Sequence, residues 1–281
     1  MRTIKRFAVL MFLLMLYGTL YAQPTIIIGA PSVSLANSST QVEFVLTYTG
    51  ATTINLTSAK VNINHNSTSG GTIEVLDGST ATPTVRISGV SGDGTYTISI
   101  LAGSSTDGTD DDAGAGPSAE VTVDNTAPTV SIGSPSSTLA NKNSTISFVL
   151  TYTGATTVNL TSSNVTINHS GTTGGTINIV DGTTTTPAVE ISDVDGNGSY
   201  TITIAGGSSS DGINSDAGSG ASSSVTVDNI APTVSIGAPS KTLASKNTTV
   251  SFPVTYSGTS SVNLTSGYVT INHTGDRKSV V

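Results

Sequence analysis

Histidine, serine and aspartate are the residue types in this chain that could carry chemistry, and the three histidines are spaced regularly. His65, His169 and His273 lie 104 residues apart. Each follows two β-branched residues at alternate positions, so each extends the inward face of an expected strand. No second histidine and no cysteine accompanies any of them, although a metal site needs several such ligands. We interpret them as strand-end histidines capped by a backbone carbonyl, and one metal ligand per domain is the alternative.

Serine is abundant, but the patterns that would make it a nucleophile are missing. No Gly-x-Ser-x-Gly sequence leads from a strand into a helix. The glycine-rich turns lie between expected strands, so they are not phosphate-binding loops. The paired carboxylates of a glycosidase need a deep cleft, which a tandem sandwich rarely has. The sequence therefore predicts that the chain is not an enzyme.

Aspartate-rich loops are the one feature that suggests a ligand, and that ligand is calcium. Hard cations take several oxygen ligands, which aspartates supply. One candidate site is the loop with Asp107, Asp110, Asp111 and Asp112, and the other is the domain junction at Asp124. The alternative is the ordinary role of aspartate in turns. No other cofactor is expected.

A repeat of 104 residues organises the chain around these loops. Ala-Pro-Thr-Val at residues 127–130 recurs at residues 231–234. Residues 24–127 and 128–231 align without a gap, and more than half of their positions are identical. A period of about 100 residues is that of a whole domain rather than of a solenoid repeat. We predict two complete domains with these bounds and a truncated third domain over residues 232–275.

Each unit is predicted to be an all-β sandwich. Val42, Phe44, Leu46 and Tyr48 alternate with outward-facing positions, and this alternation marks a half-buried strand. About eight such runs fill a unit, separated by turns rich in glycine and aspartate. No segment after the first 22 residues has a helical period. Short strands at this density predict tandem immunoglobulin-like Greek-key sandwiches.

Tyr96 and Tyr200 are assigned a structural role. Each follows a glycine-rich turn, which in the first unit is residues 92–94. In immunoglobulin folds a tyrosine near the start of strand F bonds its hydroxyl to upstream backbone, and a cysteine lies two residues later. Ile98 and Ile202 occupy that later position here. We predict such a tyrosine corner in both units, and the alternative is a core tyrosine with a polar tip.

The unit ends resemble a known family. Both units end in Val-Asp-Asn and continue into Ala-Pro-Thr-Val, at residues 123–130 and 227–234. Together with the Asp-Gly-x-Tyr-like turn and the Asp-Ala-Gly stretches that follow Asp111 and begin at Asp216, this resembles the bacterial Ig-like repeats of surface proteins, adhesins and extracellular enzymes. The resemblance covers residues 24–275 and implies the fold. It implies no ligand residues, because such repeats serve many purposes.

The first 22 residues are predicted to be a secretory signal peptide. Arg2, Lys5 and Arg6 form a basic region, and the apolar run that follows is shorter than the ~20 residues of a spanning helix. The formal net charge of −8 makes the chain a poor candidate for binding nucleic acid or anionic membranes. We predict a secreted or cell-surface protein, with no membrane insertion of the mature chain.

Residues 276–281 are predicted not to be native. The third unit follows the second as far as Gly275 and then reads Asp-Arg-Lys-Ser-Val-Val. The codons GAT CGG AAG AGC GTC GTG TAG, which spell these residues and a stop, belong to a short-read sequencing adapter. We interpret the tail as a sequencing-adapter artefact and expect the protein to continue.

These features together predict a non-catalytic structural or adhesive repeat region of a bacterial surface protein, as a fragment of a longer chain. Its partner would be a surface ligand of unknown kind, protein or glycan. Two alternatives are an accessory Ig-like region of a secreted enzyme whose catalytic domain is missing, and a ligand-binding module. The lack of tryptophan argues against a sugar-binding platform.

Overall fold

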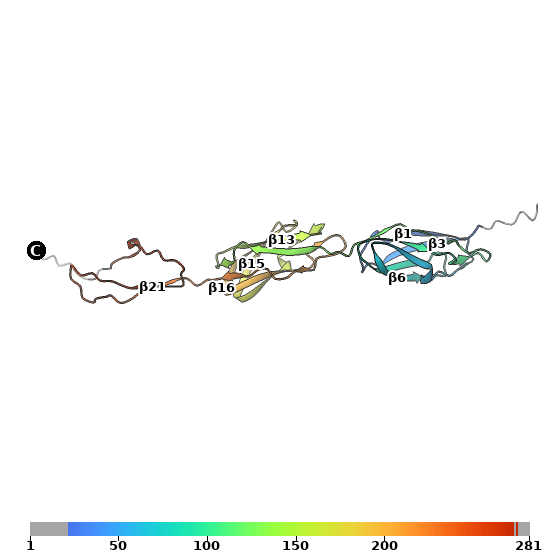
Figure 1. Ribbon diagram of the computed structural model, residues 1–281. Coiled ribbons are helices and arrows are strands. Elements are labelled where there is room, and N and C mark those ends of the chain that lie inside the picture. The colour runs from blue at the N-terminus through green and yellow to red at the C-terminus, as the bar shows by residue number, and fades with distance from the viewer. Residues whose placement is uncertain (1–21, 273, 275–281) are drawn as a thin grey trace, which may run out of the picture.

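The computed structural model describes residues 22–272 and 274, which contain strands and three short 3₁₀ turns (Figure 1). Two sandwiches and an open third unit follow one another in a row (Figure 1). The predicted signal peptide up to residue 21, His273 and the tail over 276–281 lie outside the described residues. No helix in the described part of the chain is long and apolar enough to cross a membrane.

The first sandwich has two four-stranded sheets and a small strand pair. One sheet has the order β1-β3-β7-β6, with bounds Thr25–Pro31, Val42–Thr49, Thr84–Ser91 and Ser69–Leu76. The other has the order β2-β10-β8-β5, with bounds Leu35–Ala36, Val121–Val123, Gly94–Ile100 and Val61–Asn66. β4 (Thr53–Ile54) and β9 (Ser105–Thr106) pair with each other, and the turn η1 spans Ser58–Lys60.

This strand order is that of an immunoglobulin domain. β1, β3, β7 and β6 correspond to strands A, B, E and D, and β5, β8 and β10 correspond to C, F and G. β2 adds a short strand that runs parallel to β10 at the other edge of that sheet. The predicted all-β, immunoglobulin-like fold is therefore confirmed.

The second sandwich repeats this arrangement with longer continuous strands. Its first strands are β11 (Thr129–Pro135), β12 (Leu139–Ala140), β13 (Ile146–Thr153) and β14 (Thr157–Val158), followed by the turn η2 (Ser162–Asn164). Two long strands come next, β15 (Val165–Val180) and β16 (Ala188–Ala205). The last are the short strands β17 (Ser209–Ser210), β18 (Gly218–Ser219) and β19 (Val225–Val227). β15 and β16 pair along their whole length, and β16 also pairs with β13 and β19. Register shifts between Ser170 and Thr172 interrupt the β15–β16 pairing. Such irregularities bend a strand pair, which lets this one pass from one sheet to the other.

Glycine is required at this crossing. Gly198 has a φ of +153°, and a Cβ on it would collide with the carbonyl oxygen of Ser170. Gly94 has a φ of +154° at the equivalent place in the first sandwich, where a Cβ would collide with the carbonyl oxygen of Asn66. The glycine-rich turn before each tyrosine therefore lets two backbone segments approach closely.

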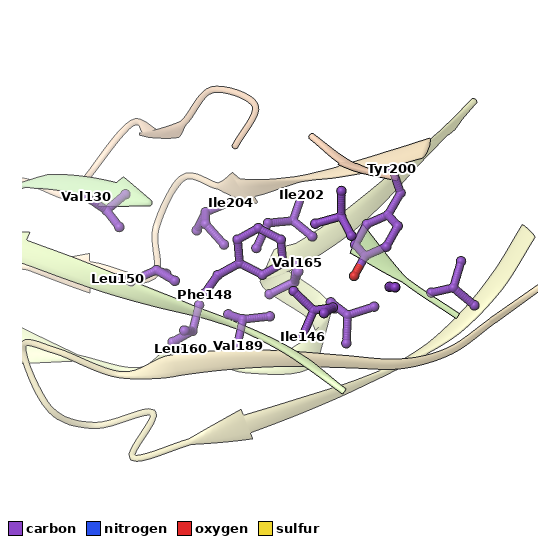
Figure 2. Packing of buried hydrophobic residues seen from close by; sticks show 14 of the residues in the cluster. Val130, Ile146, Phe148, Leu150, Leu160, Val165, Val189, Tyr200, Ile202 and Ile204 are labelled. Atoms are coloured by element: carbon purple, nitrogen blue, oxygen red, sulfur yellow. The ribbon is translucent and has the colours of Figure 1, made fainter. Parts of the chain in front are cut away.

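Each sandwich has its own apolar core. Phe44 and Leu46 in the first, and Phe148 and Leu150 in the second, are completely buried. Figure 2 shows Phe148, Leu150 and other side chains of the second core meeting between the two sheets. The two core clusters have no residue in common. The domain bounds at residues 127 and 231 remain predictions.

The third unit has apolar residues at the same repeat positions, but many of them are exposed. It contains β20 over Thr233–Ile236, β21 over Val254–Ser257 and the turn η3 over Ser266–Tyr268. Phe252 is 55% exposed, whereas its counterparts Phe44 and Phe148 are 0% exposed. Phe252, Leu264 and Ile271 line an open groove.

The difference between these phenylalanines predicts a difference in stability. We expect Phe148→Ala to lower the unfolding free energy of the second sandwich by about 3–5 kcal/mol, because it opens a cavity in a closed core. Phe252→Ala is the matched control and should cost little, since Phe252 already contacts solvent. Hydrogen exchange of the β16 and β21 amides in the full chain measures both effects. Equal losses at the two positions would contradict this account of the third unit.

Candidate functional site

The aspartate-rich loop of the first sandwich is organised around one buried carboxylate. Asp112 is 1% exposed. Its Oδ2 accepts hydrogen bonds from the backbone N–H of Ser105 at 2.5 Å and from the hydroxyls of Ser104 and Ser105 at 3.1 Å each. Its Oδ1 accepts from the N–H of Gly114 at 2.9 Å. Donors from the loop itself therefore surround the carboxylate and offset the cost of burying it.

Tyr48, which lies on β3, completes this network. The hydroxyl of Tyr48 lies 2.8 Å from Ser104 Oγ. Because the Ser104 hydroxyl donates to Asp112, the Tyr48 hydroxyl is the donor to Ser104. Burial raises the pKa of Tyr48, the hydrogen bond with Ser104 opposes this, and the charge of Asp112 raises the pKa further. The second sandwich repeats the chain of bonds from Tyr152 through Ser208 to Asp216.

The other aspartates of the loop lie nearer the surface. Asp107 Oδ1 accepts from the N–H groups of Asp110 and Thr109 at 2.8 Å each. These two bonds lower the pKa of Asp107, the one from Asp110 more strongly. Asp110 and Asp111 are exposed. The loop is thus a hydrogen-bonded turn with two free carboxylates at its rim.

Asp124, the second calcium candidate, lies apart from this loop. Its Oδ1 accepts from the N–H of Thr126 at 3.0 Å, which is the turn geometry that aspartate commonly adopts. Among residues 22–272 and 274, no three His, Cys, Asp or Glu side chains are grouped so as to hold a metal ion. Calcium binding by Asp107, Asp110, Asp111, Asp112 or Asp124 stays a prediction.

His65 and His169 bond side chains rather than backbone. His65 Nδ1 lies 2.9 Å from Thr68 Oγ1, and the Thr68 hydroxyl donates to the carbonyl of Thr95 at 3.0 Å. The ring nitrogen is therefore the donor to Thr68. His169 makes the same contact with Thr172. For these two histidines the predicted cap by a backbone carbonyl is wrong, because the threonine hydroxyl lies between the ring and the carbonyl.

The predicted tyrosine corner is also wrong. Tyr96 and Tyr200 are 1% exposed, yet neither hydroxyl has a hydrogen-bond partner among the described residues. Burial raises the pKa of each to about 12. Figure 2 shows the ring of Tyr200 directed between the sheets, among the core side chains. Because the side chain points into the core, its hydroxyl does not reach the upstream backbone, and the tyrosine is a core residue.

The junction after β10 is bound to a turn of the first sandwich. The N–H of Asn125 donates to Asp93 Oδ1 at 2.6 Å, and Asn125 Nδ2 donates to the carbonyl of Gly92 at 2.8 Å. The hydroxyl of Thr126 donates to Asp93 Oδ2 at 2.5 Å. The bonds from Thr126 and then Asn125 lower the pKa of Asp93.

The second junction has the same arrangement, with the amide of Asn197 in place of the carboxylate of Asp93. The N–H of Asn229 donates to Asn197 Oδ1 at 2.7 Å, and Asn229 Nδ2 donates to the carbonyl of Gly196 at 2.6 Å. The sequence analysis identified the recurring Val-Asp-Asn motif at the unit ends but missed these hydrogen bonds. The signal for them was the identical position of Asn125 and Asn229 in the repeat, opposite the turns that hold Asp93 and Asn197.

No protein-family model and no curated protein sequence matches the chain. Several solved structures are similar over most of its length. The adhesin InvE of Yersinia pseudotuberculosis has 14% identity and a TM-score of 0.27, over 75% of this chain and 62% of that one. The Escherichia coli adhesin FdeC has 13% identity and a TM-score of 0.33, over 84% of this chain and 73% of that one.

A third similar structure is a C-terminal fragment of intimin in complex with the intimin-binding domain of its receptor Tir. It has 12% identity and a TM-score of 0.28, over 76% of this chain and 67% of that one. The chain thus spans less than two thirds of the InvE structure. The fold assignment rests on the strand order of the chain itself, and no functional argument rests on similarities of this size.

The contrast between the two kinds of buried tyrosine can be tested. Tyr200→Phe should leave the unfolding free energy of the second sandwich unchanged or raise it, because it removes a buried hydroxyl that has no partner. Tyr152→Phe is the matched variant and should cost about 1 kcal/mol, since it breaks the bond to Ser208. Denaturant unfolding measures both. A loss in Tyr200→Phe as large as that in Tyr152→Phe would restore the tyrosine corner.

Calcium binding is tested by thermal unfolding of the full chain. A ligand that binds only the folded state raises the melting temperature. We expect equal melting temperatures with millimolar calcium and with chelator, because Asp107, Asp112 and Asp124 already accept hydrogen bonds within their own turns. A rise with calcium that disappears in the double variant Asp110→Asn/Asp111→Asn would instead establish the loop as a calcium site.

Proposed function

We propose that this chain is a non-catalytic structural or adhesive repeat region displayed on the surface of a bacterial cell. The observation that carries the proposal is the row of sandwiches in Figure 1, in which the chain passes from one unit to the next end to end. Each added unit lengthens the row. Such an arrangement suits a part that holds something away from a surface.

A pair of parallel strands, one from near each end of the unit, supports a load-bearing role. β2 and β10 run parallel, with bonds from the N–H of Thr122 to the carbonyl of Ser34 and from the N–H of Asp124 to the carbonyl of Ala36, both at 2.9 Å. Tension on the two ends of the unit pulls these strands in opposite directions along their length. The bonds between them are then loaded together rather than one after another. β12 and β19 repeat this pairing.

The outward faces of the sandwiches favour an extracellular spacer that stays in solution. Asn64 Nδ2 donates to the hydroxyls of Thr97 and Ser99 on the neighbouring strand, at 3.2 and 2.8 Å. Asn168 makes the equivalent contacts with Thr201 and Thr203. The surface is therefore covered with hydroxyl and amide groups, and the formal charge of −8 opposes self-association. A protein or glycan at the far end of the row would be its partner.

Surface display is tested on the bacterium that carries the gene. Antibodies against residues 24–231 should label intact cells, and brief treatment with external protease should remove the label. The mature protein isolated from these cells should begin at Gln23, after removal of the signal peptide. Labelling that requires cell lysis, or a chain that keeps residues 1–22 inside the cell, would overturn the proposal.

The adhesive role is tested by gene deletion. A deletion strain should attach less well to host cells or to abiotic surfaces than the parent does. Attachment that is unchanged by deletion would leave the chain as a spacer without adhesive contribution.

A further inference from the structure

One side chain of the second sandwich reaches across the junction to the first. Asn214 lies in the loop between β17 and β18. Its Nδ2 donates to the carbonyl of Asp124 at 3.0 Å, and its Oδ1 accepts from Asn37 Nδ2 at 3.1 Å. Asn37 Nδ2 also donates to the carbonyl of Ile213 at 3.3 Å. Three hydrogen bonds thus connect the sandwiches in addition to the covalent linker.

Burial separates these residues from their counterparts elsewhere in the chain. Asn37, Asp124 and Asn214 are half-buried. The residues 104 positions away from them, Asn141, Asp228 and Asp110, are exposed. The repeat makes the local structure around each pair the same, so the contact between the sandwiches accounts for the difference in burial.

Asn214 is held in position by its own loop. Asp211 Oδ1 accepts from the N–H groups of Ile213 at 2.8 Å and of Asn214 at 2.7 Å, and Asp211 Oδ2 accepts from Asn214 Nδ2 at 3.2 Å. Little conformational freedom remains for the contact to remove. A preorganised group of this kind loses less entropy when it docks, so its hydrogen bonds contribute more to the joint.

The receiving side is held in position as well. Asn37 Oδ1 accepts from the N–H of Ser39 at 3.0 Å, which fixes the turn and leaves Nδ2 free to face the second sandwich. The N–H of Ser38 donates to Asn125 Oδ1 at 2.6 Å, and Asn125 is bound to Asp93. The linker beside Asp124 is therefore bound to the first sandwich by contacts that do not involve the second sandwich.

We propose that Asn214, Asn37 and the carbonyl of Asp124 form a latch that holds the first two sandwiches at a fixed angle. The latch needs an amide at position 214, because that side chain donates to one partner and accepts from the other. The first sandwich has Asp110 at the same place, and an ionised carboxylate has no N–H to donate. The inference concerns the joint alone and holds wherever the protein is displayed.

The latch is tested by measuring distances across the joint in the full chain. The chain has no cysteine, so Ser79→Cys and Thr183→Cys add two unique sites at exposed, equivalent positions. Spin labels at these sites report the distribution of distances between the sandwiches by pulsed electron paramagnetic resonance. We expect one narrow distribution for the labelled parent chain.

The double variant Asn37→Asp/Asn214→Asp keeps the size of both side chains and removes all three hydrogen bonds. With each bond worth about fivefold, the ratio of docked to undocked joints should fall about 100-fold, and the distribution should broaden. The matched control is Asn141→Asp, the position equivalent to Asn37 in the second sandwich, and it should leave the distribution narrow. Circular dichroism and hydrogen exchange verify that both sandwiches remain folded in each variant.

Two results would overturn the latch. One is a distribution in the double variant that is as narrow as in the parent chain. The other is equal broadening in the Asn141→Asp control, which would show that the broadening does not depend on the bonds at the joint. Neither result bears on surface display, so failure of the latch is distinguishable from failure of the proposed function.

Discussion

The need to cover one apolar face of every sheet explains the main differences between the units of this chain. Alternation of side chains gives each sheet an inward row of Val, Ile, Leu and Phe, and a row of this kind is stable only against another sheet. In the first unit the sheet that contains β5, β8 and β10 provides that cover, and in the second unit the sheet that contains β19 and the second half of β16 does so, so Phe44 and Phe148 are completely buried. In the third unit the described strands provide no such cover, and Phe252 stays half in solvent. Phenylalanine thus occupies the same repeat position in all three units, but it is buried in two of them and exposed in the third.

Closing the sandwich decides what polar groups inside it can do. Asp112 and Asp216 lie at the end of the core, where loop N–H groups and serine hydroxyls can surround a carboxylate. The hydroxyls of Tyr96 and Tyr200 lie between the sheets, where no donor or acceptor among the described residues reaches them. The buried carboxylates of Asp112 and Asp216 therefore have hydrogen-bond donors, whereas the buried hydroxyls of Tyr96 and Tyr200 have no partner among the described residues. The higher cost of burying an unpaired charge is consistent with this order.

Sequence reasoning reached the fold because period-two alternation and a 104-residue repeat are local or exact signals. It did not reach the buried role of Asp112, since four aspartates in one loop look alike until the ends of the sheets show which one is enclosed. It placed Tyr200 on the correct strand but could not show that the hydroxyl points into the core. It missed Asn214 because residues 37 and 214 are brought together only by the joint between two sandwiches. The one available signal was the asparagine at position 214 where the first unit has Asp110.

The repeat preserves the residues that fold a sandwich and changes one of the residues that join two sandwiches, and this distinction bears on function. Residues that fold a unit, such as Phe44, Tyr48 and Asp112, recur unchanged 104 positions later. Among the latch residues, Asn37 and Asp124 recur as Asn141 and Asp228, whereas the counterpart of Asn214 is Asp110. If stiffness at each joint is set by a single surface side chain, a row of nearly identical sandwiches can have stiff and flexible joints in a chosen order. The reach of such a row then depends on a few loop residues rather than on the number of units alone.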